Sequence, residues 1–256
     1  MIPFKSKYIS TKFNWANYVI IAVCSLVFYW ETQSGWPSVE PYVFNPKSFS
    51  GVLSAIFLHA DLTHLLGNML VLMVFGKAIV DKIGNVLYLV LFVAMGIMGN
   101  VTYGLFNAQP AIGASGAISG VLAMSLMLMP FVEIKTIVWI LPPIVMDISA
   151  FWIAGIWFIF DLTNLSKSDS AIAYHAHIGG FIAGLIISVV LLLIGKVTYA
   201  LDEKSFIELF FGMKVGKRTT EEEKCKACGS TIFTHDKNCV RCGRNLTTKY
   251  KNRVSY

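Results

Sequence analysis

One serine stands between glycines at the start of an apolar run. The stretch Gly113-Ala114-Ser115-Gly116 precedes the almost wholly apolar residues 117–129. A serine hydroxyl in a membrane helix usually hydrogen-bonds a carbonyl one turn back, whereas flanking glycines let a substrate or another backbone come close. A histidine, His177, begins another apolar run, in Ala176-His177-Ile178-Gly179-Gly180. A serine nucleophile activated by a histidine base is the chemistry that these types predict, and their setting favours proteolysis inside a bilayer.

Two more polar residues lie within a different apolar run. His64 and Asn68 are four residues apart, so they point from one face of a helix. Polar residues inside a membrane segment are functional candidates by default. We therefore add both to the candidate site.

Small residues recur beside the serine and the histidine at a spacing of four. Gly116 and Gly120 follow the serine, and Gly180 and Gly184 follow the histidine. Such pairs let two helices approach closely in lipid. We expect this packing to bring the imidazole within hydrogen-bond reach of the serine hydroxyl.

The composition is that of a polytopic membrane protein. Of 256 residues, 55% are hydrophobic and only 14% are charged, against about 25% charged in soluble domains. Crossing a bilayer takes roughly 20 apolar residues. We expect six spans, near residues 15–31, 62–80, 86–106, 114–132, 148–164 and 174–195. Five is the alternative, because Pro142, Pro143 and Asp147 interrupt the apolar stretch leading into the fifth.

The lysines between the spans predict the topology. Most of them fall on one side of the membrane, namely Lys5, Lys7, Lys12, Lys77, Lys82 and Lys135, and only Lys47 and Lys167 fall on the other. This bias predicts that both termini are cytoplasmic, and we expect the plasma membrane of a prokaryote. Spans two, four and six then enter from the outer face. The four polar candidates consequently share a depth, a turn or two below the outer surface.

The C-terminal part is basic and carries four paired cysteines. Residues 196–256 hold 13 Lys/Arg against 7 Asp/Glu, which accounts for the whole net charge of +6. Two CxxC units, each followed by a glycine, have ten residues between Cys228 and Cys239, and their cysteines are Cys225, Cys228, Cys239 and Cys242. Four thiolates at this spacing predict a structural zinc site. Disulfides are the alternative, but a cytoplasmic tail would keep the thiols reduced.

These motifs together resemble the rhomboid family of intramembrane serine proteases. The resemblance covers roughly residues 15–195 and rests on His64-x-x-x-Asn68, Gly113-Ala-Ser115-Gly116 and Ala176-His177-x-Gly-Gly180-x-x-x-Gly184. It implies an all-α bundle of six membrane helices that opens outward. It also implies a Ser–His dyad without a third carboxylate.

The resemblance assigns a role to each matching position. Ser115 would be the nucleophile and His177 the general base, then acid. His64, Asn68 and the Ser115 backbone N–H would form the oxyanion hole, and Gly113 matches the small residue before the serine. Where the family often has an aromatic ring one turn after the serine, this chain has Ser119.

The resulting organisation is a protease domain with a small metal-binding appendage. We expect a cytoplasmic N-terminus at 1–14, the rhomboid-like domain at 15–195, a basic linker at 196–222, a zinc-ribbon-like domain at 223–247 and a tail at 248–256. Expected partners are transmembrane protein substrates, the lipid bilayer and a cytoplasmic protein that the zinc tail would bind. Nucleic-acid binding by the basic tail is a less favoured interpretation.

Three other readings of the membrane domain remain open. An inactive relative that binds and routes membrane proteins would be expected to lack the serine or the histidine, and both are present. A transporter with histidine proton relays would be expected to show repeats between its halves. A metal or haem site built from the histidines leaves Ser115 and Asn68 unexplained.

Overall fold

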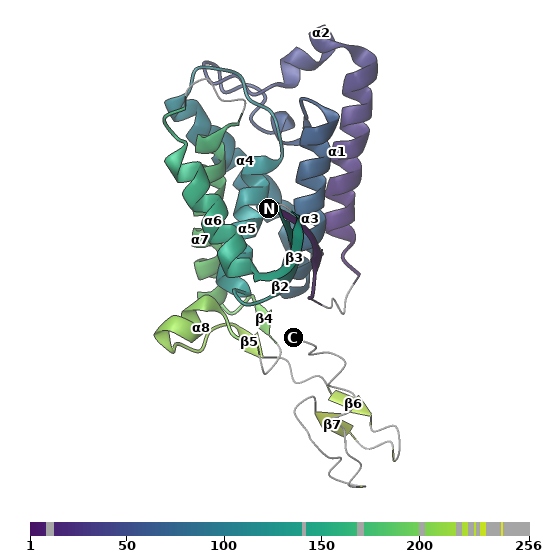
Figure 1. The fold of residues 1–256 in the computed structure, drawn as a ribbon, viewed down its shortest axis with the longest axis vertical. Helices are drawn as coiled ribbons and strands as arrows, with labels where there is room; N and C mark the ends of the chain where they lie inside the picture. The colour runs from purple at the N-terminus through teal and green to yellow at the C-terminus, as the bar shows by residue number, and fades with distance from the viewer. Residues whose placement is uncertain are drawn as a thin grey trace.

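The protein is an antiparallel helical bundle with a small sheet against one side (Figure 1). The computed structural model describes residues 1–8, 13–139, 142–167, 172–199, 203–218, 222–224, 228, 231–233 and 242. The helices are α1 (Trp15–Ser34), α2 (Trp36–Val39), α3 (Leu62–Ile83), α4 (Asn85–Phe106), α5 (Ser115–Leu128), α6 (Ala150–Thr163), α7 (Tyr174–Leu193) and α8 (Phe206–Phe211), with 3-10 turns η1 (Glu40–Tyr42) and η2 (Ser54–Phe57). The strands are β1 (Ile2–Ser6), β2 (Glu133–Val138), β3 (Ile144–Ser149), β4 (Thr198–Tyr199), β5 (Lys217–Arg218), β6 (Glu222–Lys224) and β7 (Thr231–Phe233).

Three helices of the described part are long and apolar enough to cross a membrane. They are α3, α4 and α7, with 22, 22 and 20 residues. They confirm the helices predicted near residues 62–80, 86–106 and 174–195. Helix α1 has 20 residues but is less apolar than these three helices. Helices α5 and α6 have only 14 residues each. The count of six membrane spans therefore stays a prediction.

Helix α5 is shorter than the predicted span because a proline follows it. At 1.5 Å per residue its 14 residues extend for roughly 21 Å, less than the roughly 30 Å of a bilayer core. The helix ends at Leu128, and Met129 leaves the helical conformation with ψ 59°. Pro130 disfavours a helical residue before it, which explains this end. Nearly every residue of α5 is buried, so the helix forms the centre of the bundle.

A three-stranded antiparallel sheet corrects the expectation of a purely helical fold. Strand order is β1-β2-β3, and residues expected to lead into the fifth span form the β2–β3 hairpin. Ile134 and Thr136 are buried while their neighbours are less so, the alternation of a strand with one covered face. Figure 1 shows the sheet in front of α3 and beside α5, with the N-terminus next to it.

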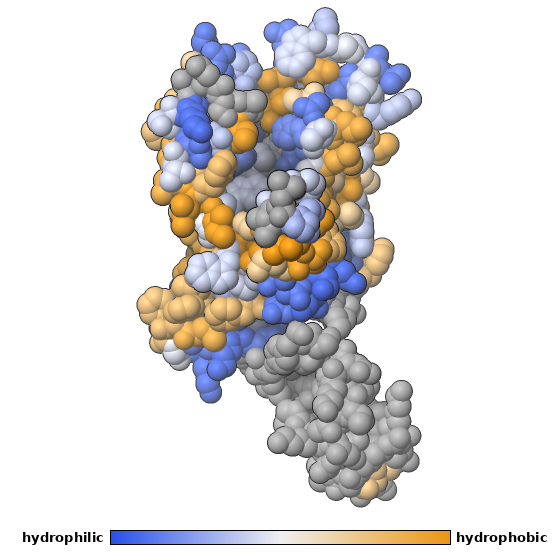
Figure 2. Space-filling model, viewed as in Figure 1, coloured by the Kyte–Doolittle hydropathy of each residue, from blue (hydrophilic) through white to orange (hydrophobic). Residues whose placement is uncertain are grey.

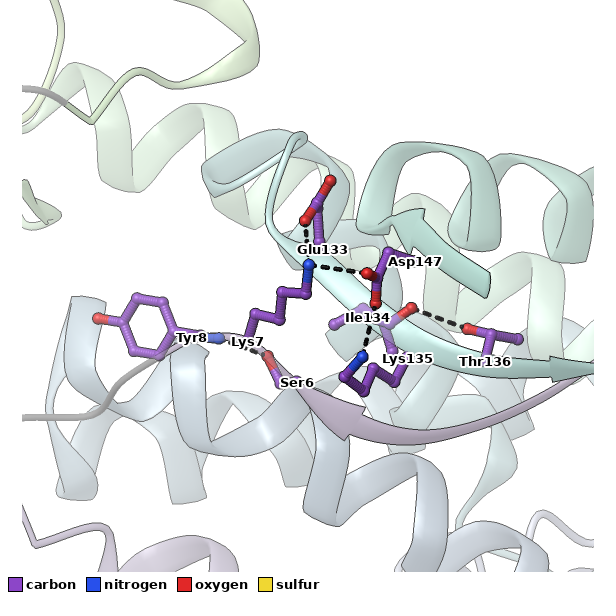
Figure 3. A network of polar contacts seen from close by, with 8 residues as sticks. All are labelled: Ser6, Lys7, Tyr8, Glu133, Ile134, Lys135, Thr136 and Asp147. Carbon is purple, nitrogen blue, oxygen red and sulfur yellow. Dashed lines mark hydrogen bonds and ion pairs between the residues drawn. The ribbon is translucent and has the colours of Figure 1, made fainter. Parts of the chain in front are cut away.

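Ion pairs fasten the start of the chain to this sheet (Figure 3). Lys7 Nζ lies 2.7 Å from a Glu133 carboxylate oxygen and 2.8 Å from one of Asp147, which also pairs with Lys135 at 3.4 Å. The hydrogen bond from Lys7 lowers the pKa of the Asp147 carboxyl below its ordinary value. The residues just after β1 are thereby held against both strands of the hairpin.

Apolar side chains cover the outside of the bundle. Figure 2 shows hydrophobic residues over much of the visible helical surface and polar residues gathered toward its ends. Leu26, Val86, Leu105 and Leu193 are all more than two-thirds exposed. So much exposed apolar surface on the helices fits a lipid environment.

Candidate active site

The first residue of α5 is Ser115, and Gly113 shapes the turn before it. Gly113 has φ +128°, a backbone conformation that side chains rarely adopt. A β-carbon placed there would lie 2.9 Å from both Cε1 and Nε2 of His64 and 3.7 Å from the Ser115 hydroxyl oxygen. Glycine at this position therefore lets the serine and the His64 ring border the same small space.

The His64 ring presents its Nε2 edge to that space. Asp61 caps α3 by accepting a hydrogen bond from the His64 backbone N–H at 2.8 Å, which places the ring in the first turn. The Ala60 backbone N–H donates to His64 Nδ1 at 3.4 Å. In a neutral imidazole with Nδ1 accepting, Nε2 carries the proton. The edge beside Gly113 and Ser115 is thus a hydrogen-bond donor.

Asn68 adds a second available donor on the same helix. Its side chain is buried, and its Nδ2 has no hydrogen-bond partner among the described residues. A buried amide without a partner is costly in a stable protein, so such a group invites a functional explanation. Its four-residue spacing from His64 places both side chains on one face of α3.

His59 supports His64 from the preceding loop. The two rings meet edge to face with centroids 5.2 Å apart, and the His59 backbone N–H donates to the Glu31 carboxylate at 3.2 Å. Burial lowers the pKa of His59 to about 4, so this ring is neutral at physiological pH. Its neutrality avoids placing a positive charge against the His64 ring.

Helices α5 and α7 touch through their glycines. A β-carbon on Gly180 would overlap the Gly116 carbonyl oxygen, and one on Gly184 would overlap that of Gly120. One on Gly116 would lie 3.2 Å from the carbonyl oxygen of Ala176. The backbones are therefore in direct contact, as small residues at a spacing of four permit. Gly116, next to Ser115, therefore lies against Ala176, next to His177.

The ring of His177 is held by a carboxylate that the sequence interpretation did not include. His177 Nδ1 lies 3.2 Å from Oδ2 of Asp161, on α6. Both side chains are buried, with 8% and 4% of their surface exposed. The Tyr174 ring meets the imidazole edge to face, with centroids 6.4 Å apart. The structure thus differs from the expected dyad without a third carboxylate.

An apolar cavity of about 310 Å³ adjoins this pair. Its polar lining includes Asp161 and His177, and its walls come from α6, the sheet and the N-terminal residues Met1 and Pro3. One side of the imidazole therefore borders this cavity.

Two expected features of the site have a different form in the structure. The hydrogen bonds of the described residues do not include one between the Ser115 hydroxyl and His177, although their neighbours are in contact. Ser119 Oγ is buried and has no hydrogen-bond partner in the described part of the chain. The aromatic contact to the histidine comes instead from Tyr174, on its own helix. Apo sites often have long catalytic hydrogen bonds that tighten when substrate binds.

The structure describes two of the four predicted zinc ligands. Cys225 and Cys239 lie outside the described residues, as does the predicted tail at 248–256. Cys228 and Cys242 are described, in turns. Zinc binding by these four cysteines therefore stays a prediction.

Comparison with known proteins identifies relatives for most of the bundle. A rhomboid domain model matches residues 46–194. The rhomboid protease GluP of Bacillus subtilis is 31% identical over 178 residues, which covers 66% of this chain and 33% of GluP. Rhomboid protein 1, mitochondrial, of Saccharomyces cerevisiae is 25% identical over 189 residues, covering 66% of this chain and 51% of that protein. RHOMBOID-like protein 12, mitochondrial, of Arabidopsis thaliana is 25% identical over 148 residues, covering 50% of this chain and 42% of that protein.

The chain thus spans between a third and about a half of the length of these relatives. The part that the rhomboid domain model matches, residues 46–194, includes Ser115, His177, His64 and Asn68.

Proposed function

This chain belongs to the rhomboid family, and from that premise we propose that it is an intramembrane serine endopeptidase. It would cleave transmembrane segments of other membrane proteins near the outer face of the membrane. The observation that carries the proposal is the meeting of Ser115, Gly113 and the Nε2 edge of His64 at the start of the buried helix α5. Retention of both serine and histidine disfavours the alternative of an inactive binding protein.

The proposed chemistry starts at the Ser115 hydroxyl. His177, on the adjoining helix, would take the hydroxyl proton as the oxygen attacks the scissile carbonyl, and then return it to the leaving amine. The oxygen of the tetrahedral intermediate would be stabilised by His64 Nε2–H, Asn68 Nδ2–H and the Ser115 backbone N–H. First-turn backbone N–H groups have no partner within a helix, so this last donor is available. The preferred substrate segment is expected to contain weak helix formers, because helical peptide bonds are shielded by neighbouring turns.

The test of this proposal is covalent labelling of the purified protein in detergent. A fluorophosphonate probe should attach to Ser115, which mass spectrometry of the tryptic or chymotryptic peptide would locate. The same preparation should cut a model transmembrane substrate. A well-folded preparation that neither labels at Ser115 nor cleaves such a substrate contradicts the assignment.

Loss of a single oxyanion donor should slow turnover without preventing folding. Asn68→Ala and His64→Ala are each expected to lower kcat by about 10- to 1000-fold with little change in KM, as loss of one preorganised donor does elsewhere. Steady-state kinetics on a detergent-presented substrate would measure both constants. If either variant turned over at the wild-type rate, that residue would be structural only.

We also propose that the C-terminal tail binds one structural zinc ion through Cys225, Cys228, Cys239 and Cys242 and takes no part in the chemistry. Four thiolates fill a tetrahedral coordination shell and leave no position for a substrate or an activated water. Truncation after Lys217 should abolish zinc binding, measured by metal analysis, yet leave cleavage nearly unchanged. Loss of activity on chelation in a protein that remains folded would instead show that the tail regulates the protease.

The remaining assignments follow the family membership and the lysine distribution. The protein is an integral membrane protein, and we propose that both termini face the cytoplasm of a prokaryote. Transmembrane proteins would be its substrates, and the zinc tail would hold a cytoplasmic protein partner.

A further inference from the structure

Helix α6 contains a single ionisable side chain, Asp161, in an otherwise apolar sequence. This carboxylate is buried, and its side-chain hydrogen bond in the described part of the chain goes to His177 Nδ1, at 3.2 Å. Isolated charges inside a membrane domain are rare, and those that occur usually pair with another polar group and mark a function. The partner here is the proposed catalytic base.

The direction of this hydrogen bond determines which nitrogen of His177 is free. An ionised carboxylate can only accept, so Nδ1 must donate. In the neutral ring the other nitrogen, Nε2, then has a lone pair and can accept the proton of a serine hydroxyl. Without this partner the ring could adopt the opposite tautomer, which cannot act as the base.

The same contact also fixes the orientation of the imidazole. His177 has glycines near it on α7, and the expected aromatic neighbour on α5 is replaced by Ser119. On the α5 side, therefore, no aromatic ring at position 119 confines the imidazole. The hydrogen bond to Asp161 on α6 and the edge contact with Tyr174 orient the imidazole instead.

We propose that Asp161 is a positioning residue that acts through His177, so that this chain works with a Ser115–His177–Asp161 triad. The carboxylate would hold the Nδ1–H tautomer in the resting enzyme and stabilise the imidazolium that forms when Ser115 attacks. It would accept the hydrogen bond throughout and transfer no proton. This inference rests on the proposed protease function.

The test compares three variants of the full-length protein in detergent. Asp161→Asn keeps the shape but its amide can donate to Nδ1 and favour the wrong tautomer, so kcat should fall by about 10²- to 10⁴-fold with KM changed less than about threefold. Asp161→Glu, which keeps an acceptor, should recover a large part of the activity. Asp147→Asn is the matched control, since that carboxylate lies in the sheet and pairs with lysines; it should leave kcat unchanged. Fluorophosphonate labelling of Ser115 should slow in the same order as kcat.

A measurement on the unaltered protein covers the case in which Asp161→Asn does not fold. Histidine-selective ¹⁵N spectra, with the His177 signal identified by its loss in His177→Ala, should show Nδ1 protonated and Nε2 unprotonated at neutral pH. The Nε2–H tautomer, or an Asp161→Asn enzyme with kcat within threefold of wild type, would overturn the role of Asp161. That result leaves the protease assignment intact, whereas absence of cleavage and of Ser115 labelling in the wild type refutes the assignment itself.

Discussion

Ser115→Ala is expected to abolish cleavage of a transmembrane substrate, with kcat reduced by about 10⁶-fold, the size of the loss when the nucleophile of a serine protease is removed. The change removes one oxygen at the first residue of α5 and should leave the helix in place. In the described structure this hydroxyl takes part in no hydrogen bond that the fold would lose. Thermal unfolding in detergent should therefore be close to that of the wild type. Gel-based release of the substrate fragment would measure the effect.

A second serine on the same helix supplies the control. Ser125 is buried and its hydroxyl donates to the Val121 carbonyl at 3.0 Å. Ser125→Ala removes the same atom from the other end of α5 and should retain full activity. His177→Ala should also abolish cleavage, but it leaves the Asp161 carboxylate buried without its partner, so it should cost stability as well. Cleavage by a purified Ser115→Ala protein would refute the assignment of this site.

Gly180→Ala is expected to have the largest effect on stability. The added methyl would overlap the Gly116 carbonyl oxygen, and the two helix backbones would have to move apart. Overpacking of a tight core costs about 1–3 kcal/mol and sometimes more. The shift would also move His177 relative to Ser115, and a misplacement of about 1 Å can cost about 100-fold in rate. Thermal or denaturant unfolding in detergent, with kcat measured on the folded fraction, would separate the two effects.

Gly155→Ala is the matched control for that experiment. Gly155 lies within α6, and nothing would lie within 4 Å of its added methyl. Alanine is the better helix former by about 1 kcal/mol, so this variant should be as stable as the wild type or more so. If Gly180→Ala were equally stable and active, the contact between α5 and α7 would have to be looser than the structure shows.

The sequence predicted the long helices well because they are apolar throughout. Helices α3, α4 and α7 lie where hydropathy and length placed them. The ends of the shorter helices were missed where local chemistry overrides hydropathy: Pro130 stops α5, and the residues leading toward the fifth span pair as a hairpin. An apolar stretch rich in β-branched residues can be a membrane helix or a buried strand, and periodicity alone does not separate them.

The candidate site was predictable in part. Glycines around Ser115 and His177 correctly indicated a close helix pair, because small residues at a spacing of four let two helix backbones approach closely. Asp161 was visible as a carboxylate in an apolar segment, but its partner is set by how α6 rotates against α7. That rotation depends on packing across the bundle and is not encoded in the spacing of either helix alone.

The pairing of the first strand has a consequence for the order in which the protein is built. Ile2 of β1 pairs with Ile137 of β2, more than 130 residues later in synthesis. Helices α1, α3, α4 and α5 all emerge from the ribosome before the partner strand exists, so β1 is among the last elements to reach its place. Met1 and Pro3 form part of the wall of the cavity beside His177. The pocket next to the proposed base is therefore completed only after most of the bundle has been synthesised, when β1 pairs with the hairpin.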